Sequence, residues 1–393
     1  MTPEKIKILF FDHSPVISGA EYSLLDILQG LNNGPRDCHL LTVKGGQLIR
    51  PAGDLGVTIH GISLSDRILS ISKHGLQKGP WKFLTVSGEA VKAVISICRL
   101  LRREKFDIIY TNSLKSHILG GLAGRAAGVK VIWHVRDIPV HKTPARMIRI
   151  FSAFLPDRII AVSEAASRPF DASKVSIIYN GIDTDKVHKM AAREMPAEIK
   201  RILRNSKNCQ FIGIVGQIAR WKGQDVFLRA VRLLAGKLPR AKFLIIGESL
   251  FLEQGFKQEL ENFVAGNKIQ KRVVFTGQLE NVYPLMQRLD ILVHSSIEPE
   301  PFGRVIIEAM ALGVPVIAAR GGASDEIIRD GDDGLLVSPG AHGQLAGAIE
   351  RLLADKPLRK RIINNGSIRV RRAFGLKEML DKISDLIHQM PIE

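Results

Sequence analysis

The stretch DILVHSSIEPEPFGRVIIEAMALGVPVIAA, residues 290–319, decides the fold class. Its first residues, 290–295, are apolar and β-branched, which predicts a buried strand. The run VIIEAMAL that follows the loop consists mostly of helix formers, and Gly313 stands where a helix usually ends. A second apolar run, residues 314–319, predicts the next strand. A strand, a helix and another strand in this order form the repeating unit of a parallel α/β sheet.

The same alternation of strand-like and helix-like segments continues over almost the whole chain. In the first half, strands are predicted at residues 5–11, 39–43, 57–60, 107–112, 130–135, 158–163 and 176–180. In the second half they are predicted at residues 211–216, 242–247, 272–277, 290–295, 314–319 and 334–338. The polar stretch 185–209 lacks strand character, so we interpret it as a linker and the first helix of a second unit.

These segments predict an α/β protein of two doubly wound, Rossmann-like domains, residues 1–184 and 185–375, which face each other across a cleft. The length of 393 residues agrees, because single hydrophobic cores stop growing below that size. In doubly wound sheets the ligand binds at the carboxyl ends of the strands. We therefore expect the site to be built from the loops that follow the strands.

The composition is that of a soluble globular protein, with 45% hydrophobic and 24% charged residues. No secretory leader precedes the first predicted strand, and no apolar run is long enough for a membrane span. The three cysteines are far apart and odd in number, which indicates reduced thiols without a metal site. We therefore expect a cytoplasmic protein.

The net charge of +17 is the most unusual feature of the composition, and it raises nucleic acid as a partner. Residues 1–180 hold 24 Lys and Arg against 14 Asp and Glu, a balance of +10, and the remaining residues hold 32 against 25, a balance of +7. The excess is spread over both halves, and only 6% of the residues are aromatic. Without a basic and aromatic platform, nucleic acid is not the partner we expect.

The segment HKTPARMIRIFSAFLPDR, residues 141–158, mixes basic and apolar residues. With its arginines at the headgroups and Phe151, Phe154 and Leu155 in the interface, it would lie on an anionic bilayer. The alternative is a helix packed on the core with a solvated basic face. The first interpretation predicts peripheral contact with the inner face of the cytoplasmic membrane.

Two carboxylates flank the predicted helix start, Glu300 in the loop and Glu308 one to two turns into the helix. The backbone N–H groups between them, around Phe302, Gly303 and Arg304, would lack helical partners, and such groups hold anionic phosphate. A carboxylate can accept from both hydroxyls of a diol. The segment could therefore bind a nucleotide sugar, although first-turn acids are also common in ordinary helices.

Two cations, Arg220 and Lys222, follow the predicted strand 211–216 in a turn that begins at Gly216. The turn matches neither the Walker loop nor the dinucleotide fingerprint. At this end of the strand both cations could meet a diphosphate and stabilise the charge on a leaving phosphate. The alternative is that they are solvated loop charges.

Two further candidates lie in the first half of the chain. His134 ends a predicted strand, where an imidazole could hydrogen-bond a sugar hydroxyl, or could be purely structural. Ser18 and Gly19 follow the first strand and would allow a ligand to approach the backbone closely, and Glu21 opens a helix; the alternative is an ordinary helix N-terminus. The acidic string DGDDG, residues 330–334, could suggest a metal site, but Asp and Gly between a helix and a strand favour a tight turn.

In combination, these strings resemble the retaining glycosyltransferases of family 4, which have the GT-B fold. The resemblance rests on the order and spacing of SGAEYSL (18–24), IIYTNSLKSH (108–117), WHVRDIP (133–139), IIAVSEA (159–165), IIYNGID (177–183), GIVGQIARWKGQDVFLRA (213–230), EPEPFGRVIIEAMALGVPVIA (298–318) and DEIIRDGDDGLLV (325–337). It implies a UDP-, GDP- or ADP-sugar donor, no metal and no further cofactor. It also implies that the last helix, about residues 376–390, crosses back onto the first domain.

The resemblance assigns roles to the candidate residues as follows: Glu300 and His134 near the donor sugar, Glu308 on the ribose, Arg220, Lys222 and the backbone of Gly303 to Val305 on the diphosphate, and Gly19 close to the phosphates. Two positions depart from the family pattern. Gln217 stands where the family usually has arginine, and the loop GGASDE (321–326) leaves open whether Asp325 or Glu326 does the usual work.

The leading hypothesis is an enzyme that transfers a sugar from a nucleotide diphosphate sugar to a glycan or lipid-linked acceptor with retention of configuration. One alternative is a GT-B epimerase or sugar phosphorylase, which product analysis without an acceptor would reveal. The other is a non-catalytic protein that binds nucleic acid or an anionic surface through its positive charge.

Overall fold

The computed structural model describes residues 5–32, 34–69, 81–139, 142–204, 208–249 and 253–391. The chain divides into two compact units. Unit 1 comprises Met1–Gly181 and Leu376–Glu393, and unit 2 comprises Ile182–Gly375. The sequence predicted boundaries at 184/185 and 375/376. Each unit is described by itself.

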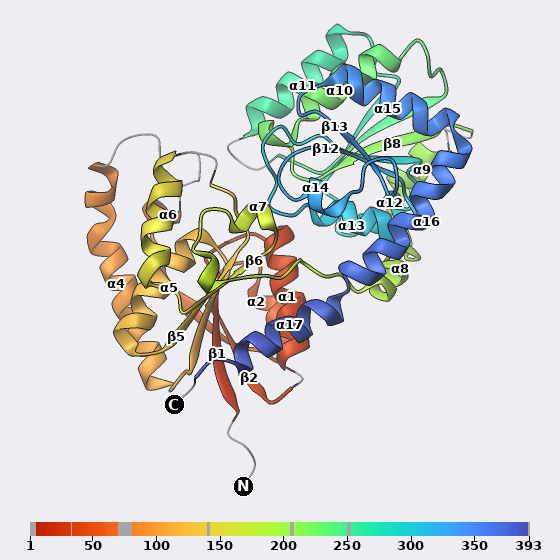
Figure 1. Cartoon of the computed structure of the whole chain (residues 1–393). Helices are drawn as coiled ribbons and strands as arrows, with labels where there is room; N and C mark the ends of the chain where they lie inside the picture. Colours follow the sequence, from red (N-terminus) through yellow and green to blue (C-terminus); the bar gives the residue numbers. More distant parts are fainter. Residues whose placement is uncertain are drawn as a thin grey trace. The chain divides into compact units, whose positions relative to one another are not determined.

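Unit 1 contains a parallel sheet of seven strands in the order β3-β2-β1-β4-β5-β6-β7 (Figure 1). The strands are β1 (Ile6–Phe11), β2 (Arg36–Val43), β3 (Thr58–Ile62), β4 (Ile108–Thr111), β5 (Lys130–Val135), β6 (Arg158–Ala161) and β7 (Val175–Ile177). Strand β1 lies between β2 and β4, with Ile8 in register with Cys38 of β2 and with Ile108 of β4. The chain order reverses between β1 and β4, which makes the carboxyl ends of these strands the expected ligand position.

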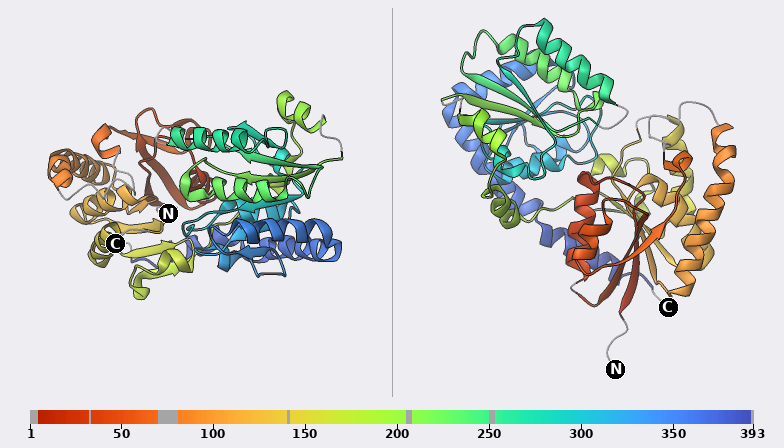
Figure 2. Two further views of the ribbon diagram at one scale, coloured as in Figure 1. Left: turned by 90° about the horizontal axis from the view of Figure 1, so that it is seen from above. Right: turned by 180° about the vertical axis from the view of Figure 1, so that it is seen from behind.

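Helices cover both faces of this sheet, which explains why its strands are apolar along their whole length. They are α1 (Gly19–Asn32), α2 (Ile49–Asp54), α3 (Asp66–Leu69), α4 (Trp81–Arg103), α5 (Leu114–Ala127), α6 (Lys142–Phe154), α7 (Glu164–Ser167), the short 3-10 turn η2 (Ala172–Lys174) and α17 (Leu376–His388). Ile8 and Phe10 point to the face covered by α1, α2 and α17. Leu9 and Phe11 point to the face covered by α4, α5 and α6 (Figure 2).

The C-terminal helix α17 packs closely on α1 within unit 1. Gly30 of α1 makes this approach possible, because a Cβ atom at that position would lie 2.3 Å from Leu380 of α17. Arg36 at the start of β2 adds hydrogen bonds to Ser384 and His388 of the same helix.

Helix α6 corrects part of the membrane interpretation of residues 141–158. Leu155, expected in the lipid interface, is 2% exposed and packs in the core, and Phe151 packs partly against the same core. With Ile148 they recur every three to four residues, the spacing of a core-facing helix side. Ile150 and Phe154 are exposed, so the outer side of α6 is both basic and apolar. Residues 140 and 141 lie outside the described part of the chain.

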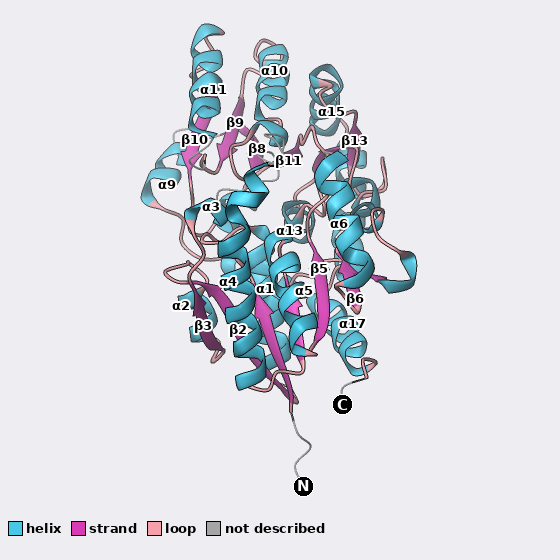
Figure 3. Cartoon of the chain, turned by 90° about the vertical axis from the view of Figure 1, so that its left-hand side faces the viewer, coloured by secondary structure: helices cyan, strands magenta, loops and turns pink. Residues whose placement is uncertain are grey.

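Unit 2 contains a second parallel sheet, of six strands in the order β10-β9-β8-β11-β12-β13 (Figure 3). The strands are β8 (Gln210–Val215), β9 (Ala241–Ile246), β10 (Val273–Gly277), β11 (Ile291–His294), β12 (Val316–Ala319) and β13 (Leu335–Val337). The helices are α8 (Thr184–Ala191), α9 (Ala197–Arg204), the 3-10 turn η3 (Arg220–Lys222), α10 (Gln224–Leu234), α11 (Gln254–Gly266), α12 (Tyr283–Met286), α13 (Arg304–Ala311), α14 (Ser324–Ile327), α15 (His342–Ala354) and α16 (Lys356–Ala373).

The second sheet repeats the topology of the first, with its reversal between β8 and β11. Helices α10, α11 and α15 share one core with its strands, and α13 contacts β11 and β12. The prediction of two doubly wound α/β sheets is therefore confirmed. Within the described ranges, no helix combines the length and apolar character needed to cross a bilayer.

The two ends of unit 2 lie side by side. Ile182 forms a parallel bridge with Gly375, and its N–H donates to the carbonyl of Phe374 at 2.9 Å. The first and last residues of this unit are thus joined by backbone hydrogen bonding.

Candidate active site

The main polar cluster of unit 2 lies at the carboxyl ends of β8 and β11, where the strand order reverses. Lys222 belongs to η3 after β8, and its Nζ lies 2.5 Å from Oε1 of Glu300, in the loop after β11. The other carboxylate oxygen, Oε2, accepts from His294 Nε2 at 2.7 Å and from Ser296 Oγ at 2.8 Å. Both oxygens of Glu300 are thus held in a fixed direction.

The charge of Glu300 is stabilised although its side chain is only 12% exposed. Burial raises the pKa of this carboxyl, but Lys222 and His294 outweigh it and hold the pKa well below its ordinary value. Because an ionised carboxylate only accepts hydrogen bonds, His294 must carry its proton on Nε2. Its Nδ1 is buried and has no partner among the described residues.

Two glycines allow the neighbouring loops to close around Glu300. Gly322, in the loop after β12, has φ of +64°, and a Cβ atom there would lie 2.1 Å from the carbonyl oxygen of Glu300. Gly223, after η3, has φ of +69°, and a Cβ atom there would lie 2.1 Å from the carbonyl oxygen of Ser295. Ala323 N–H donates to the Glu300 carbonyl at 2.9 Å, so the ends of three strands are tied together.

In the GGASDE loop, the side chain of Asp325 bonds within the loop. Asp325 accepts from the N–H of Gly321 at 2.6 Å and pairs with Arg320, so it stabilises the loop itself. The DGDDG string forms the expected tight turn, with Asp333 buried and bonded to Arg329 at 2.6 Å. No cluster of metal-ligating side chains occurs in the part of the chain that the structure describes.

Helix α13 begins beside the cluster. Gly303 caps it with φ of +84°, and a Cβ atom there would lie 3.6 Å from His294 Nε2. The N–H groups of the first turn, including that of Val305, point out of this end of the helix. Phe302 is buried against Phe374, with ring centroids 5.8 Å apart, which anchors the loop before the helix. Glu308 lies one turn on, 3.3 Å from Arg304 Nε.

The two cations predicted to act together are separated by the structure. Arg220 turns toward α11, where it pairs with Glu259 and lies over the ring of Phe256 at 4.9 Å. Its side chain is 60% exposed, whereas that of Lys222 is 14% exposed. Gly216 ends β8 with φ of +143°, and a Cβ atom there would lie 3.9 Å from Lys222 Cε. Gly216 and Lys222 thus lie together, and Arg220 lies elsewhere.

In unit 1, His134 is fully buried near the end of β5. Its Nδ1 accepts from Tyr110 Oη at 2.5 Å and from Arg136 Nη2 at 3.2 Å. The proton of the neutral ring must therefore be on Nε2, which is buried and has no partner in the described residues. Burial first, then Arg136 and His117, hold the pKa of His134 well below 6.5, so the ring is neutral. It is a donor without an acceptor.

A chain of hydrogen bonds between polar side chains holds the His134 ring in place. Arg136 Nε donates to Asn112 at 2.6 Å, and Asn112 donates to Asp12 at 2.7 Å. Asp12 and Asn112 follow β1 and β4, the reversal point of this sheet. Burial, helped by Glu21, raises the pKa of Asp12 to about 6.

Gly19 is the first residue of α1, so the helix begins two residues before the predicted start at Glu21. The side chain of Glu21 accepts from the N–H and the hydroxyl of Ser18, at 2.7 and 2.5 Å, and so caps the start of the helix. The N-terminal end of α1 is therefore rigid and carries a buried carboxylate beside Gly19.

Sequence reasoning missed His294, Ser296 and the network behind His134. Each missed residue lies at the end of an apolar strand or within two residues after it, as in VHSS (293–296) and YTNS (110–113). A polar residue at the carboxyl end of a parallel strand was the available signal.

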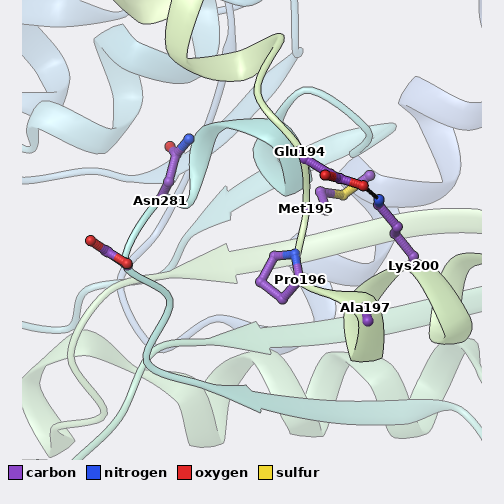
Figure 4. A pocket seen from close by; sticks show the side chains of 7 residues that line it. Glu194, Met195, Pro196, Ala197, Lys200 and Asn281 are labelled. Carbon is purple, nitrogen blue, oxygen red and sulfur yellow. Dashed lines mark hydrogen bonds and ion pairs between the residues drawn. The ribbon is translucent and has the colours of Figure 1, made fainter.

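A pocket of unit 2 lies apart from the predicted site residues, none of which lines it (Figure 4). It is lined by Glu194, Met195, Pro196, Ala197, Lys200, Glu280 and Asn281. Glu194 and Lys200 pair with each other there. Glu280 adds a second acid to the lining, so the pocket has no evident preference for an anionic ligand.

Two family models match the chain, one in each half. The model described as Glycosyltransferase Family 4 matches residues 17–186, and the model described as Glycosyl transferases group 1 matches residues 196–369.

Relatives of known name match over long ranges. The Escherichia coli UDP-Gal:alpha-D-GlcNAc-diphosphoundecaprenol alpha-1,3-galactosyltransferase is 25% identical, over 100% of this chain and 99% of that protein. The Staphylococcus aureus capsular polysaccharide biosynthesis glycosyltransferase CapM is 24% identical, over 75% of this chain and 80% of that protein. The crystal structure of Anabaena Alr3699/HepE in complex with UDP-glucose has a TM-score of 0.81 and 25% identity, and covers 98% of this chain and 100% of that one.

The fold and the matched families define the class: a glycosyltransferase of the GT-B type that uses a nucleotide-sugar donor. The chain belongs to glycosyltransferase family 4.

Proposed function

We propose that this enzyme transfers a hexose from a UDP-sugar to a lipid-linked or polysaccharide acceptor, with retention of anomeric configuration and without a metal ion. The observation that carries the proposal is the contact of Lys222 with Glu300 beside the start of α13. A cation, a helix N-terminus and an oriented carboxylate are the groups that recognise a diphosphate and the hydroxyls of a sugar. The uridine base and the hexose are proposed from the printed names of the relatives.

In this proposal Glu300 accepts hydrogen bonds from hydroxyls of the transferred sugar. Its low pKa keeps it ionised, and His294 and Ser296 keep its oxygens directed. A charged acceptor makes hydrogen bonds about twice as strong as a neutral one. Glu300 therefore serves to orient the sugar.

The diphosphate is assigned to Lys222 and to the N–H groups at the start of α13, from Phe302 to Val305. As the bond to the sugar breaks, negative charge grows on the leaving phosphate, and fixed positive groups stabilise this charge without reorganising. Gly216 leaves room for the phosphate beside Lys222. Glu308 is assigned to the ribose hydroxyls, with Arg304 holding its carboxylate.

In unit 1, His134 offers a bound sugar its single unpartnered N–H. A ligand oxygen at Nε2 would remove the cost of a buried donor without a partner, about 1–3 kcal/mol. Because the ring is neutral and its Nδ1 is occupied, His134 is assigned to hydrogen bonding and has no part in proton transfer. The close approach at Gly19 stays a proposal for the phosphates.

The acceptor is proposed from the class of the relatives, whose names include a diphosphoundecaprenol and a capsular polysaccharide. An acceptor anchored in a membrane and a donor in solution would meet at the membrane surface. We therefore keep the proposal of a cytoplasmic enzyme in peripheral contact with the membrane.

A thermal-shift panel of UDP-, GDP- and ADP-sugars tests the donor, because a ligand that binds only the folded state raises its melting temperature. We expect a shift with UDP-hexoses, smaller for Glu308→Gln. The anomeric configuration of the product, read by NMR coupling constants, tests retention. An inverted product, or activity that a chelator abolishes and a divalent cation restores, would overturn the mechanism.

A further inference from the structure

Charge is divided between the two faces of unit 1. The face covered by α4, α5 and α6 carries eight cations and one acid among the side chains that are described, a balance of +7. The cations are Lys92, Arg99, Arg102, Arg103, Lys115, Arg125, Arg146 and Arg149, and the acid is Glu89. The opposite face, covered by α1, α2 and α17, carries three cations and six acids, a balance of −3.

Four of the eight cations are available to a partner, whereas Arg103 pairs with Glu104 and Arg125 pairs with Asp157. Lys92 and Arg99 of α4 and Arg146 and Arg149 of α6 are exposed and have no ion pair within the described ranges. In contrast, Lys377 and Lys382 of α17 pair with acids of their own helix. Unneutralised cations on one face are a footprint for an anionic partner.

Large apolar side chains are exposed on the same three helices. They are Val91 and Ile95 of α4, Leu122 of α5, and Ile150 and Phe154 of α6. Ile150 and Phe154 are 53% and 52% exposed; Ile150 is next to Arg149 in the sequence, and Phe154 lies about one turn further along α6. Cations next to exposed aliphatic and aromatic side chains match a lipid interface, where charges meet headgroups and apolar groups enter the acyl boundary.

The three helices form one continuous surface (Figure 3). Arg102 of α4 donates to the carbonyl of Ala126 at the end of α5. Arg125 of α5 donates to the carbonyl of Leu155 after α6 at 2.7 Å. Gly121 of α5 lets the chain approach Leu155, where a Cβ atom would lie 3.1 Å away. The outer surface of α4, α5 and α6 is here called the basic layer.

We propose that the basic layer docks unit 1 onto an anionic lipid bilayer. Electrostatic attraction brings the layer to the headgroups, and Ile150 and Phe154 then enter the interface. Nucleic acid is the other anionic partner to consider. Its phosphates would bind the cations, but they would not bind the five exposed aliphatic and aromatic side chains. The proposal rests on the peripheral location proposed above, and is independent of the donor chemistry of unit 2.

The test is flotation of the full chain with vesicles of phosphatidylcholine alone, or of an equimolar mixture with phosphatidylglycerol. We expect binding to the anionic vesicles at low salt, with strong weakening at high salt. The double variant Arg146→Gln/Arg149→Gln is expected to lower the vesicle partition coefficient about thirtyfold, because each cation near such a surface contributes about a fivefold gain. Ile150→Ser/Phe154→Ser is expected to weaken the binding that remains at high salt.

Matched control variants remove equivalent groups from other helices. Arg371→Gln/Arg372→Gln takes two exposed arginines from α16 of unit 2, and Leu233→Ser/Ile368→Ser takes two exposed apolar side chains from α10 and α16. These controls are expected to bind vesicles as the natural chain does. An equal loss in the controls would show that the total charge drives binding, and would overturn the proposal.

The docking proposal would also be overturned if the protein did not bind anionic vesicles at low salt. It would likewise be overturned if the protein bound duplex nucleic acid through Arg146 and Arg149 but did not bind vesicles. The thermal shift with a UDP-sugar is measured on the same samples. A retained shift without vesicle binding refutes only the docking surface, whereas vesicle binding without any donor shift refutes only the donor proposal.

Discussion

Lys222 and Glu300 form a 2.5 Å ion pair that joins the loops after β8 and β11, the two strands between which the second sheet reverses. The pair lies largely out of water, with side chains 14% and 12% exposed. Its members come from positions 78 residues apart in the sequence. The pair therefore depends on the fold being complete, and Lys222 contributes to the low pKa of Glu300.

Lys222→Ala is predicted to lower turnover about 10²- to 10³-fold, because it removes a fixed cation from the leaving phosphate. Arg220→Gln is the matched control from the same turn. It removes an exposed charge paired only with Glu259, which is expected to cost about 0–1 kcal/mol of stability and little activity. Steady-state kinetics of both variants decide the assignment. Similar losses in the two would contradict the separation of the cations.

His294→Leu, which removes the donor at this position, is predicted to act through Glu300. Without the donor at Oε2 the carboxylate loses one of the groups that lower its pKa, so this pKa rises and the acid limb of the pH–rate profile moves to higher pH. A lost hydrogen bond to a charged group corresponds to about 1.5–3 kcal/mol, or roughly a 10- to 150-fold loss of activity. A fall in activity without any movement of the acid limb would indicate a purely structural role.

The buried histidines of unit 1 make stability depend on pH with a definite sign. His134 and His117 have folded pKa values below 6.5, that of His117 at about 3 and burial being the main cause for both. The pKa of these histidines in the unfolded chain is 6.5. As the pH falls below it, they bind protons in the unfolded chain but stay neutral in the folded chain, so the folded state loses stability. The slope is about 1.4 kcal/mol per pH unit for each histidine.

Asp12 has the opposite effect on the pH dependence of stability over part of the pH range. Its folded pKa of about 6 lies above the ordinary value of 3.8, so between these values the folded state holds the extra proton and gains stability as the pH falls. Denaturant midpoints measured from pH 7.5 to 4.5 should fall, and fall less steeply in His117→Gln. A midpoint that stays constant below pH 6.5 would be incompatible with neutral buried rings.

Gly322→Ala is predicted to destabilise unit 2 by about 2–4 kcal/mol and to displace Glu300, because the new Cβ atom would overlap the Glu300 backbone. Gly321→Ala is the control. Its φ of +107° is also positive, but no atom lies within 4 Å of the added Cβ, so only the backbone strain remains. Thermal unfolding and turnover are measured for both variants. The difference between them gives the effect of the overlap with Glu300, because the strain of a positive φ is common to both.

The strands could be predicted well because they are buried on both faces, so their apolar runs are continuous. KIKILFF was expected as a strand at residues 5–11, and the strand is found at Ile6–Phe11. Their ends were less predictable. Strand β2 starts at Arg36 instead of residue 39 because Arg36 pairs in register with Ile6, which the polar string RDC does not reveal. Strand β6 ends before Ser163 because Ser163 caps the next helix.

The proximity of Glu300 and Lys222 could be anticipated, because both stand in loops that follow predicted strands. Arg220 could not be separated from Lys222, because its partner Glu259 lies on another helix. His294 was hidden in an apolar run, and its partnership with Glu300 depends on how the loop after β11 folds back. The chain from Asp12 through Asn112 to Arg136 joins three strand ends, so only the sheet order reveals it.

Because Ile182 and Gly375 form a bridge, the first and last residues of unit 2 are neighbours in space. A segment with adjacent ends can be exchanged without stretching either connection. Grafting the corresponding segment of a relative with another nucleotide preference between Gly181 and Leu376 should therefore yield a folded chimera. The nucleotide that stabilises such a chimera in a thermal-shift assay would show whether unit 2 alone sets the nucleotide preference.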